Sequence, residues 1–219
     1  MKNPLAEYLD PLPLIAVLRG IAPEEIAAVG RALTDHGFRI LEVPLNSPRP
    51  YDSIALLARA FGDRCLVGAG TVLETDQVAQ VKAAGGRLIV MPHSDGAVIR
   101  ATKKEGLVSV PGVSTPTEAF AALAAGADGL KMFPAEQLPA AALKAWRAVL
   151  PRATLVFPVG GIRPDNMEAY WAAGADGFGT GSNLYQPGAA IADVTKAAAA
   201  YAEGFRALPA RAQPAADRR

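Results

Sequence analysis

Lys131 is the residue of this chain whose type and position most clearly suggest chemistry. It lies in the strand-like run Leu130-Lys131-Met132-Phe133, where alternation places Lys131 and Phe133 on the same face. An ammonium group aimed among apolar side chains is costly to bury, and burial lowers the pKa of a lysine. A neutral amine attacks carbonyls to form Schiff bases. The first hypothesis is therefore imine chemistry at Lys131; the alternative is a strand-end lysine whose ammonium group reaches solvent.

Three further polar side chains follow short apolar runs. Glu42 and Arg19 each end such a run, and Thr71 follows the run 66–70. A carboxyl group among apolar side chains has a raised pKa, which suits Glu42 to proton transfer near neutral pH. Its alternative role is that of a structural partner for Lys131 or Arg19. The guanidinium of Arg19 and the hydroxyl of Thr71 are the donors that a substrate carboxylate would need.

Glycine turns follow the last two apolar runs of the chain. Val159 leads into Gly160 and Gly161, and the second turn contains Gly181 and Ser182. Such turns expose backbone N–H groups, and a helix that begins behind them adds its dipole. One glycine pair is often only a tight turn, but two on the strands that usually hold phosphate predict a phosphate site.

A repeat predicts the elements that must position these side chains. Ala-Ala-Gly-Ala-Asp-Gly occurs at 124–129 and again at 172–177, spaced as two strand–helix units would be. In each copy the first glycine ends a helix in the left-handed conformation that glycine adopts cheaply, and an apolar strand follows. On this pattern strands are predicted at 14–19, 39–43, 66–70, 88–91, 108–110, 129–133, 155–159 and 177–181, with helices between them.

Eight alternating units predict an α/β fold, a compact parallel (β/α)8 TIM barrel in a single domain. An open doubly wound sheet is the alternative, weakened because no Gly-x-Gly-x-x-Gly follows the first strand. We expect the barrel with a short N-terminal extension at 1–207 and a disordered tail at 208–219. Active sites of such barrels lie at the carboxyl ends of the strands, where Pro92 also falls; His93 is interpreted as a rim residue.

The bulk composition excludes several classes of function. A formal net charge of +1 gives no electrostatic case for nucleic acid. The single cysteine, Cys65, fits a reducing compartment, and the N-terminus does not read as a signal peptide, so a cytoplasmic location is expected. No stretch reaches the roughly 18 apolar residues of a membrane helix. Because Cys and His form no clusters, we expect no metal and no other cofactor.

Five segments, taken in order along the chain, resemble the motifs of one enzyme family. They are Leu18-Arg19-Gly20, Leu41-Glu42-Val43, Gly68-Ala69-Gly70-Thr71-Val72, Leu130-Lys131-Met132-Phe133-Pro134-Ala135-Glu136 and Val159-Gly160-Gly161. The family is that of the 2-keto-3-deoxy-6-phosphogluconate and -6-phosphogalactonate aldolases, and the resemblance runs from about Leu14 to Pro187. It implies a class I aldolase, a homotrimeric barrel that needs no metal. Such an enzyme cleaves a keto-deoxy sugar acid phosphate into pyruvate and glyceraldehyde 3-phosphate.

The resemblance also implies roles for individual residues. It makes Lys131 the Schiff-base lysine, Glu42 the acid/base carboxylate, and Arg19 and Thr71 the ligands of the pyruvate carboxylate. Phe133 would pack against the imine, and Gly161 and Ser182 would contact the phosphate. The full set of further substrate-binding residues is Pro92, Phe133, Val159, Gly160, Gly161, Gly181 and Ser182.

Two departures favour the galactonate branch of the family. The gluconate enzymes typically read Leu-Glu-Val-Thr-Leu-Arg-Thr where this chain reads Leu-Glu-Val-Pro-Leu-Asn-Ser (41–47), and they typically carry Thr in place of Val159. The two substrates differ only in the configuration of the C4 hydroxyl, to which Val159 cannot hydrogen-bond. The prediction is a Schiff-base lyase that cleaves 2-dehydro-3-deoxy-6-phosphogalactonate in galactonate catabolism.

Several alternatives stay open at this point. The nearest are a 2-dehydro-3-deoxy-6-phosphogluconate aldolase and an enzyme that accepts both epimers. Another phosphate-binding barrel, such as an isomerase or a thiamin-phosphate-type synthase, does not require an inward lysine on the sixth strand. The most distant alternative is a non-catalytic sugar-phosphate-binding barrel.

Overall fold

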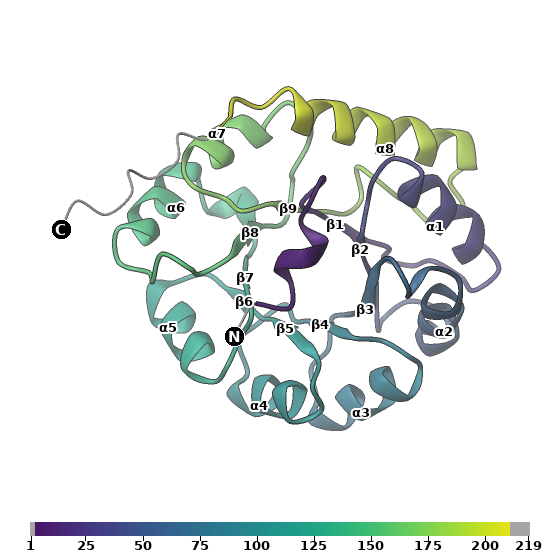
Figure 1. Ribbon diagram of the computed structural model, residues 1–219, viewed down its shortest axis with the longest axis horizontal. Helices are drawn as coiled ribbons and strands as arrows, with labels where there is room; N and C mark the ends of the chain where they lie inside the picture. The colour runs from purple at the N-terminus through teal and green to yellow at the C-terminus, as the bar shows by residue number, and fades with distance from the viewer. Residues whose placement is uncertain (1–2, 211–219) are drawn as a thin grey trace.

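A computed structural model describes residues 3–210, in which parallel strands and helices alternate and the helices surround the strands (Figure 1). The strands are β1 Leu14–Val17, β2 Ile40–Pro44, β3 Leu66–Gly70, β4 Leu88–Val90, β5 Val108–Val110, β6 Gly112–Val113, β7 Leu130–Met132, β8 Val156–Pro158 and β9 Phe178–Thr180. The helices are α1 Ile26–Thr34, α2 Pro50–Phe61, α3 Thr75–Ala83, α4 Gly96–Lys104, α5 Pro116–Ala124, α6 Ala140–Arg147, α7 Met167–Ala172 and α8 Ile191–Arg206. Two short 3-10 helices are η1 Ala6–Tyr8 and η2 Ala135–Gln137.

The strands form a curled, TIM-barrel-like parallel sheet. Six of them pair in the order β5-β4-β3-β2-β1-β9, and β6, β7 and β8 form a second ladder. An isolated parallel bridge between Val159 and Gly179 links the two ladders on one side, and Pro111 alone separates β5 from β6 on the other. The predicted parallel α/β fold is confirmed. The short β6 was not predicted; it lies beyond a proline, which has no N–H to give a ladder.

Alternation along the strands creates two apolar layers. Side chains such as Ile15, Ile40, Val90 and Phe157 pack with one another on the inner face of the curled sheet. Their neighbours in sequence, such as Leu41, pack outward against the helices. The N-terminal segment lies across the centre of the view in Figure 1, and its Leu5 and Tyr8 side chains pack with the inner layer. The carboxyl ends of the strands are left for polar side chains.

The sequence repeat has a structural reason. Gly126 and Gly174 take φ angles of 102° and 104°, which confirms the left-handed helix ends predicted for them. Asp128, next in the repeat, accepts hydrogen bonds from Lys103 and from the backbone N–H of Ser109. Asp176 does the same with Arg147 and with the backbone N–H of Val156. Each aspartate therefore ties the start of its own strand to the start of a neighbouring strand.

The ends of the described region bear on two further predictions. The tail was predicted at 208–219, and residues 211–219 of it lie outside the described residues. In the described part of the tail, the Pro209 carbonyl accepts a hydrogen bond from Trp171 Nε1 at 2.9 Å. Among residues 3–210, no helix has both the length and the apolar character to cross a membrane.

Candidate active site

A cavity of about 140 Å³ opens at the carboxyl ends of β1, β7, β8 and β9. Its lining is Val17, Arg19, Lys131, Phe133, Glu136, Val159, Gly160, Gly161, Ile162, Gly181, Ser182 and Asn183. Most of the predicted site residues are in this set, brought together from strands far apart in the sequence. Glu42, Thr71 and Pro92 are outside the lining and are described below.

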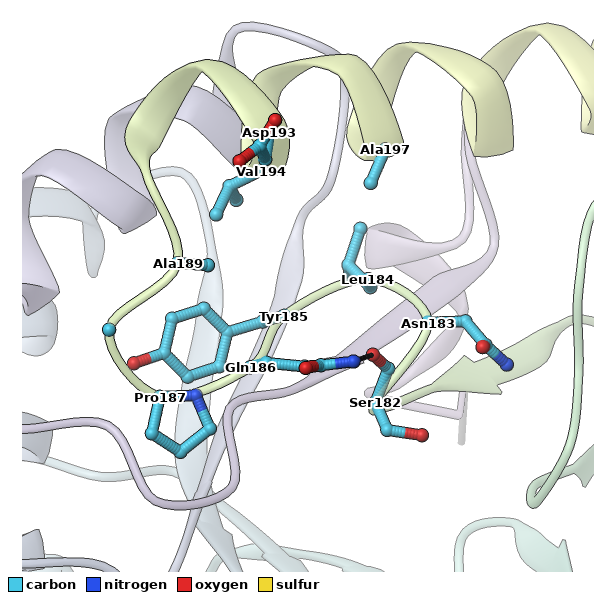
Figure 2. Close-up of a pocket in the computed structure, with 11 residues that line it drawn as sticks. Ser182, Asn183, Leu184, Tyr185, Gln186, Pro187, Ala189, Asp193, Val194 and Ala197 are labelled. Carbon is cyan, nitrogen blue, oxygen red and sulfur yellow. Dashed lines mark hydrogen bonds between the residues drawn. The ribbon is translucent and has the colours of Figure 1, made fainter.

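A larger hollow of about 360 Å³ lies between the segment 182–189 and helix α8 (Figure 2). It shares Ser182 and Asn183 with the first cavity, but its lining holds no lysine, arginine or histidine. The titratable side chains that face it are Tyr185 and Asp193, which supply neither a nucleophilic amine nor a cationic anchor. The smaller cavity, which contains Lys131, is therefore the candidate active site.

Lys131 lies in β7 between Gly112 of β6 and Phe157 of β8, with 5% of its surface exposed. Its Nζ atom lies 4.4 Å from the centre of the Phe133 ring, so the two inward side chains stack as alternation predicts. Burial lowers the pKa of Lys131 below its ordinary value; the charge of Glu42 opposes this shift and that of Arg19 adds to it. The lysine is buried in the cavity wall rather than extended into bulk solvent, and a larger fraction of it is neutral than in an ordinary lysine.

Glu42 is in register with Val17 of β1, which lines the cavity, and with Gly68 of β3, and it is 1% exposed. Its carboxylate covers Gly70, so a Cβ atom at that position would overlap the carboxylate and displace it. The Oε2 atom has no hydrogen-bond partner within residues 3–210. Burial raises the pKa of Glu42 to about 7, although the charges of Lys131 and Arg19 pull it down. A carboxyl group with such a pKa exchanges protons readily at neutral pH.

Arg19 lies at the cavity rim and is held by the loops that follow β2 and β3. Its Nη1 atom donates to Asn46 Oδ1 at 2.8 Å, and its Nη2 atom lies 3.5 Å from Thr71 Oγ1. Thr71 has a φ of 54°, an uncommon conformation for a β-branched residue and one often found at functional sites. The ion pairs of the described residues include none between Arg19 and Glu42. The sequence missed Asn46 as a site residue because its contact spans 27 positions.

The two glycine turns border the cavity on its far side. Gly160 and Gly161 have φ angles of 108° and 63°. The Glu136 side chain lies over both glycines, so that a Cβ atom at position 161 would come within 2.6 Å of its Cγ atom. In the other turn the Gly181 carbonyl accepts hydrogen bonds from the next turn of chain. Glu136 belongs to the motif around Lys131, but nothing in the sequence indicated that it would reach the glycine pair.

Pro92 and the histidines stand apart from the cavity. Pro92 follows β4, and its backbone leaves no room for a side chain at Gly112, next to Lys131 in the sheet. Gly112 and Lys131 are register partners, so Pro92 lies on the face of the sheet to which Lys131 points, outside the lining of the cavity. His93 is exposed, as its interpretation as a rim residue predicts. His36 Nδ1 lies 2.8 Å from the Ala32 carbonyl at the end of α1, away from the site.

The sequence profile of the KDPG and KHG aldolase family matches residues 5–198. A probable 2-dehydro-3-deoxy-6-phosphogalactonate aldolase of Rhizobium meliloti (strain 1021) is 48% identical over 90% of this chain and 92% of its own. The 2-dehydro-3-deoxy-6-phosphogalactonate aldolase of Escherichia coli (strain K12) is 45% identical over 91% of this chain and 98% of its own. Relatives named for the gluconate substrate are more distant; that of Treponema pallidum (strain Nichols) is 32% identical over 76% of this chain and 79% of its own.

Solved structures agree with the sequence matches. The native KDPGal structure superposes with a TM-score of 0.89 at 44% identity and covers 91% of this chain and 97% of its own. A KDPG aldolase from Legionella pneumophila, with pyruvate captured as a covalent carbinolamine intermediate, superposes with a TM-score of 0.73 at 29% identity. That superposition covers 91% of this chain and 95% of the Legionella chain.

Proposed function

We propose that this chain, which belongs to the KDPG and KHG aldolase family and is therefore a lyase, cleaves 2-dehydro-3-deoxy-6-phosphogalactonate to pyruvate and D-glyceraldehyde 3-phosphate. The observation that carries the reaction type is the pair of buried titratable side chains, Lys131 and Glu42. Lys131 has a lowered pKa, Glu42 has a raised one, and the Glu42 Oε2 atom is unpartnered within the described residues. The choice of epimer rests on the galactonate relatives, which are 45% and 48% identical to this chain.

The first half of the proposed mechanism forms an imine. The lone pair of the neutral Lys131 amine attacks C2 of the substrate, and the ketone oxygen becomes the hydroxyl of a carbinolamine. Glu42, in its protonated form and through a bridging water, donates a proton to that hydroxyl, which leaves as water. The C2–N bond becomes a protonated imine, and Glu42 is left as a carboxylate.

The second half breaks the carbon–carbon bond. The Glu42 carboxylate accepts the proton of the C4 hydroxyl, the C3–C4 bond pair moves toward the iminium, and C4 leaves as the aldehyde of glyceraldehyde 3-phosphate. Glu42 then returns the proton to C3 of the enamine. Water adds to the resulting iminium, its extra proton passes to the Glu42 carboxylate, and pyruvate and the free Lys131 amine are released. One carboxyl group thus serves alternately as acid and base, which a pKa of about 7 permits.

The rest of the cavity would hold the two ends of the substrate. Arg19 and Thr71 would bind the carboxylate beside Lys131, and the N–H groups of the Gly160–Gly161 and Gly181–Ser182 turns would bind the phosphate. Glu136 lies over the first turn, so its side chain would have to swing away when a phosphate arrives. Phe133 would cover the imine, and Pro92, which contacts Gly112 beside Lys131, would border the bound substrate.

We further propose a closed eight-stranded (β/α)8 barrel in which β5 and β6 share one strand position, forming a single domain over residues 1–207. The bridge between Val159 and Gly179 and the single residue between β5 and β6 support this closure. A homotrimer, a cytoplasmic location and a place in galactonate catabolism complete the proposal. Light scattering on the purified chain would test the assembly: a mass of one or two protomers would contradict the trimer.

Pyruvate release tests the activity directly. The chain would be supplied with the galactonate and the gluconate epimers side by side, each with EDTA present. We expect faster release from the galactonate epimer. Faster release from the gluconate epimer would keep the Lys131 chemistry and overturn the assignment of the substrate. Release from neither would overturn the proposed activity in favour of a non-catalytic sugar-phosphate-binding protein.

A further inference from the structure

Two hydrogen bonds join the loop after β1 to the loop after β2, and they differ in kind. Asn46 Oδ1 accepts from the side chain of Arg19 at 2.8 Å. Ser47 Oγ accepts from the backbone N–H of Gly20 at 2.9 Å. The serine thus holds the backbone of one loop to the other, whereas the asparagine holds a guanidinium group that faces the cavity.

The orientation of that guanidinium is determined by few contacts. It is a planar group with five N–H donors in fixed directions, so holding one donor orients the others. The hydrogen bond to Asn46 is the short one; the Nη2 atom lies at 3.5 Å from Thr71 Oγ1, at the outer limit of a hydrogen bond. Arg19 is exposed at the rim, so no surrounding side chains confine it as they confine Lys131.

We infer that Asn46 is a positioning residue, which fixes the Arg19 guanidinium so that its free donors face the carboxylate of a ketoacid bound at Lys131. The inference rests on the proposed function. A neutral acceptor suits this role, because an aspartate in its place would pair with the guanidinium and reduce the positive charge offered to the ligand.

A purely structural role for Asn46 makes a different prediction. If the asparagine served only to hold the two loops together, Ser47 would be its equivalent, since it bridges the same loops. Loss of either bond would then loosen the site in the same way for every ligand. If Asn46 acts through Arg19, its loss weakens the binding of a carboxylate and leaves a neutral ligand of the same shape unaffected.

The experiment measures how much pyruvate or pyruvamide is needed to label half of the protein in the presence of borohydride. Borohydride delivers a hydride to the imine carbon, which converts the reversible imine into a stable secondary amine seen by mass spectrometry. Pyruvamide carries a neutral amide in place of the carboxylate. The proteins compared are the unmodified chain, Asn46→Ala, its matched control Ser47→Ala, Arg19→Ala and the double variant Asn46→Ala/Arg19→Ala.

For Asn46→Ala we expect a rise of about five- to tenfold in the half-saturating concentration of pyruvate, the size of one lost orienting hydrogen bond. Its value for pyruvamide, and both values for Ser47→Ala, should change by less than about twofold. In the Arg19→Ala background the Asn46 substitution should have no further effect, because coupling through Arg19 is then absent.

Three results would overturn the inference. The first is equal weakening of both ligands by Asn46→Ala, and the second is the same pattern for Ser47→Ala. The third is that Asn46→Ala weakens pyruvate binding as much in the Arg19→Ala background as it does in the unmodified chain. Each of these leaves the proposed function intact, because the unmodified chain is still labelled. Failure of the unmodified chain to be labelled by pyruvate would overturn the proposed function, and the role of Asn46 with it.

Discussion

At the amino end of β7 a lysine and a carboxylate satisfy each other, whereas at its carboxyl end a lysine and a carboxylate do not. Asp128, just before the strand, pairs with Lys103 and also accepts the backbone N–H of Ser109. Lys131, within the strand, has Glu42 as its neighbouring charge, but the ion pairs of residues 3–210 include no contact between them. Around one short strand, therefore, one lysine and carboxylate form an ion pair and another lysine and carboxylate do not.

The difference separates charges that stabilise the fold from charges that are available for reaction. A carboxylate with its full set of partners lowers the free energy of the folded chain and has little to offer a substrate. A buried lysine and a buried glutamate without such partners cost folding free energy, and burial moves their pKa values toward each other. Functional sites are places where this cost is tolerated because a substrate will use the groups.

Replacing Lys131 by Met tests the reactive end of the strand and should have the largest effect. We expect kcat for aldol cleavage to fall by about four orders of magnitude or more, because the nucleophile is lost. Thermal unfolding should show unchanged or increased stability, since a buried amine becomes an apolar side chain of similar length. A variant with a rate near that of the unmodified chain would contradict the imine mechanism.

Replacing Glu42 by Gln should reduce kcat by about two to four orders of magnitude, the usual contribution of a general acid–base group. In the unmodified chain kcat/KM should fall above pH 7, because the first half of the mechanism needs protonated Glu42 as the acid that expels water. The variant should lack this alkaline limb in its residual activity. If the pH–rate profiles of both proteins show the same alkaline limb, a group other than Glu42 titrates.

The sign of the stability change with pH follows from the same group. The pKa of Glu42 is about 7 in the folded chain and close to the ordinary value of 4.5 when unfolded. The unfolded chain therefore releases this proton first as the pH rises. Glu42 reduces the free energy of unfolding progressively between about pH 4.5 and 7, and Glu42→Gln should remove that part of the pH dependence.

Replacing Asp128 by Asn tests the structural end of the same strand. The free energy of unfolding should fall by about 1–2 kcal/mol, because the partly exposed charge pair with Lys103 is lost while an acceptor for Ser109 N–H remains. Urea denaturation measures the loss, and kcat should stay within about twofold of the unmodified chain. A large loss of kcat at unchanged stability would show that the two ends of β7 are not separable in this way.

Replacing Val159 by Thr makes the smallest change and sharpens the account of the reactive end. Val159 lines the cavity and packs against Gly179, and Thr nearly preserves its shape. A new hydroxyl can hydrogen-bond the C4 hydroxyl, so the preference for the galactonate over the gluconate epimer should fall by about five- to tenfold. The ratio of kcat/KM values for the two epimers measures it. If this ratio is unchanged, Val159 does not determine the preference between the two epimers.

Local pattern explains why much of this was predictable from the sequence. Successive side chains of a strand point to opposite faces, and the apolar neighbours show which face is which. It follows, without knowledge of the fold, that Lys131 shares a face with Phe133 and that Glu42 shares a face with Ile40. The glycines at the helix ends are equally local, since one backbone conformation requires them. These two signals were sufficient to predict a parallel α/β fold and to place Lys131 and Glu42 inside it.

What the sequence did not predict depends on contacts between distant loops. The hydrogen bond from Arg19 to Asn46 and the position of Glu136 over Gly160 and Gly161 have no periodic signal, because each joins segments whose approach is determined only by the complete fold. The interruption between β5 and β6 is similar: Pro111 was visible in the sequence, but not that pairing would resume beyond it.

The most direct test of the central claim is to incubate the chain with pyruvate and borohydride and to locate the modification by peptide mass spectrometry. If Lys131 is the reactive amine, one pyruvate-derived group should be found per chain, on Lys131, with Lys103 unmodified. Labelling should be absent in Lys131→Met. Labelling of another lysine, or the same extent of labelling in Lys131→Met, would contradict the account.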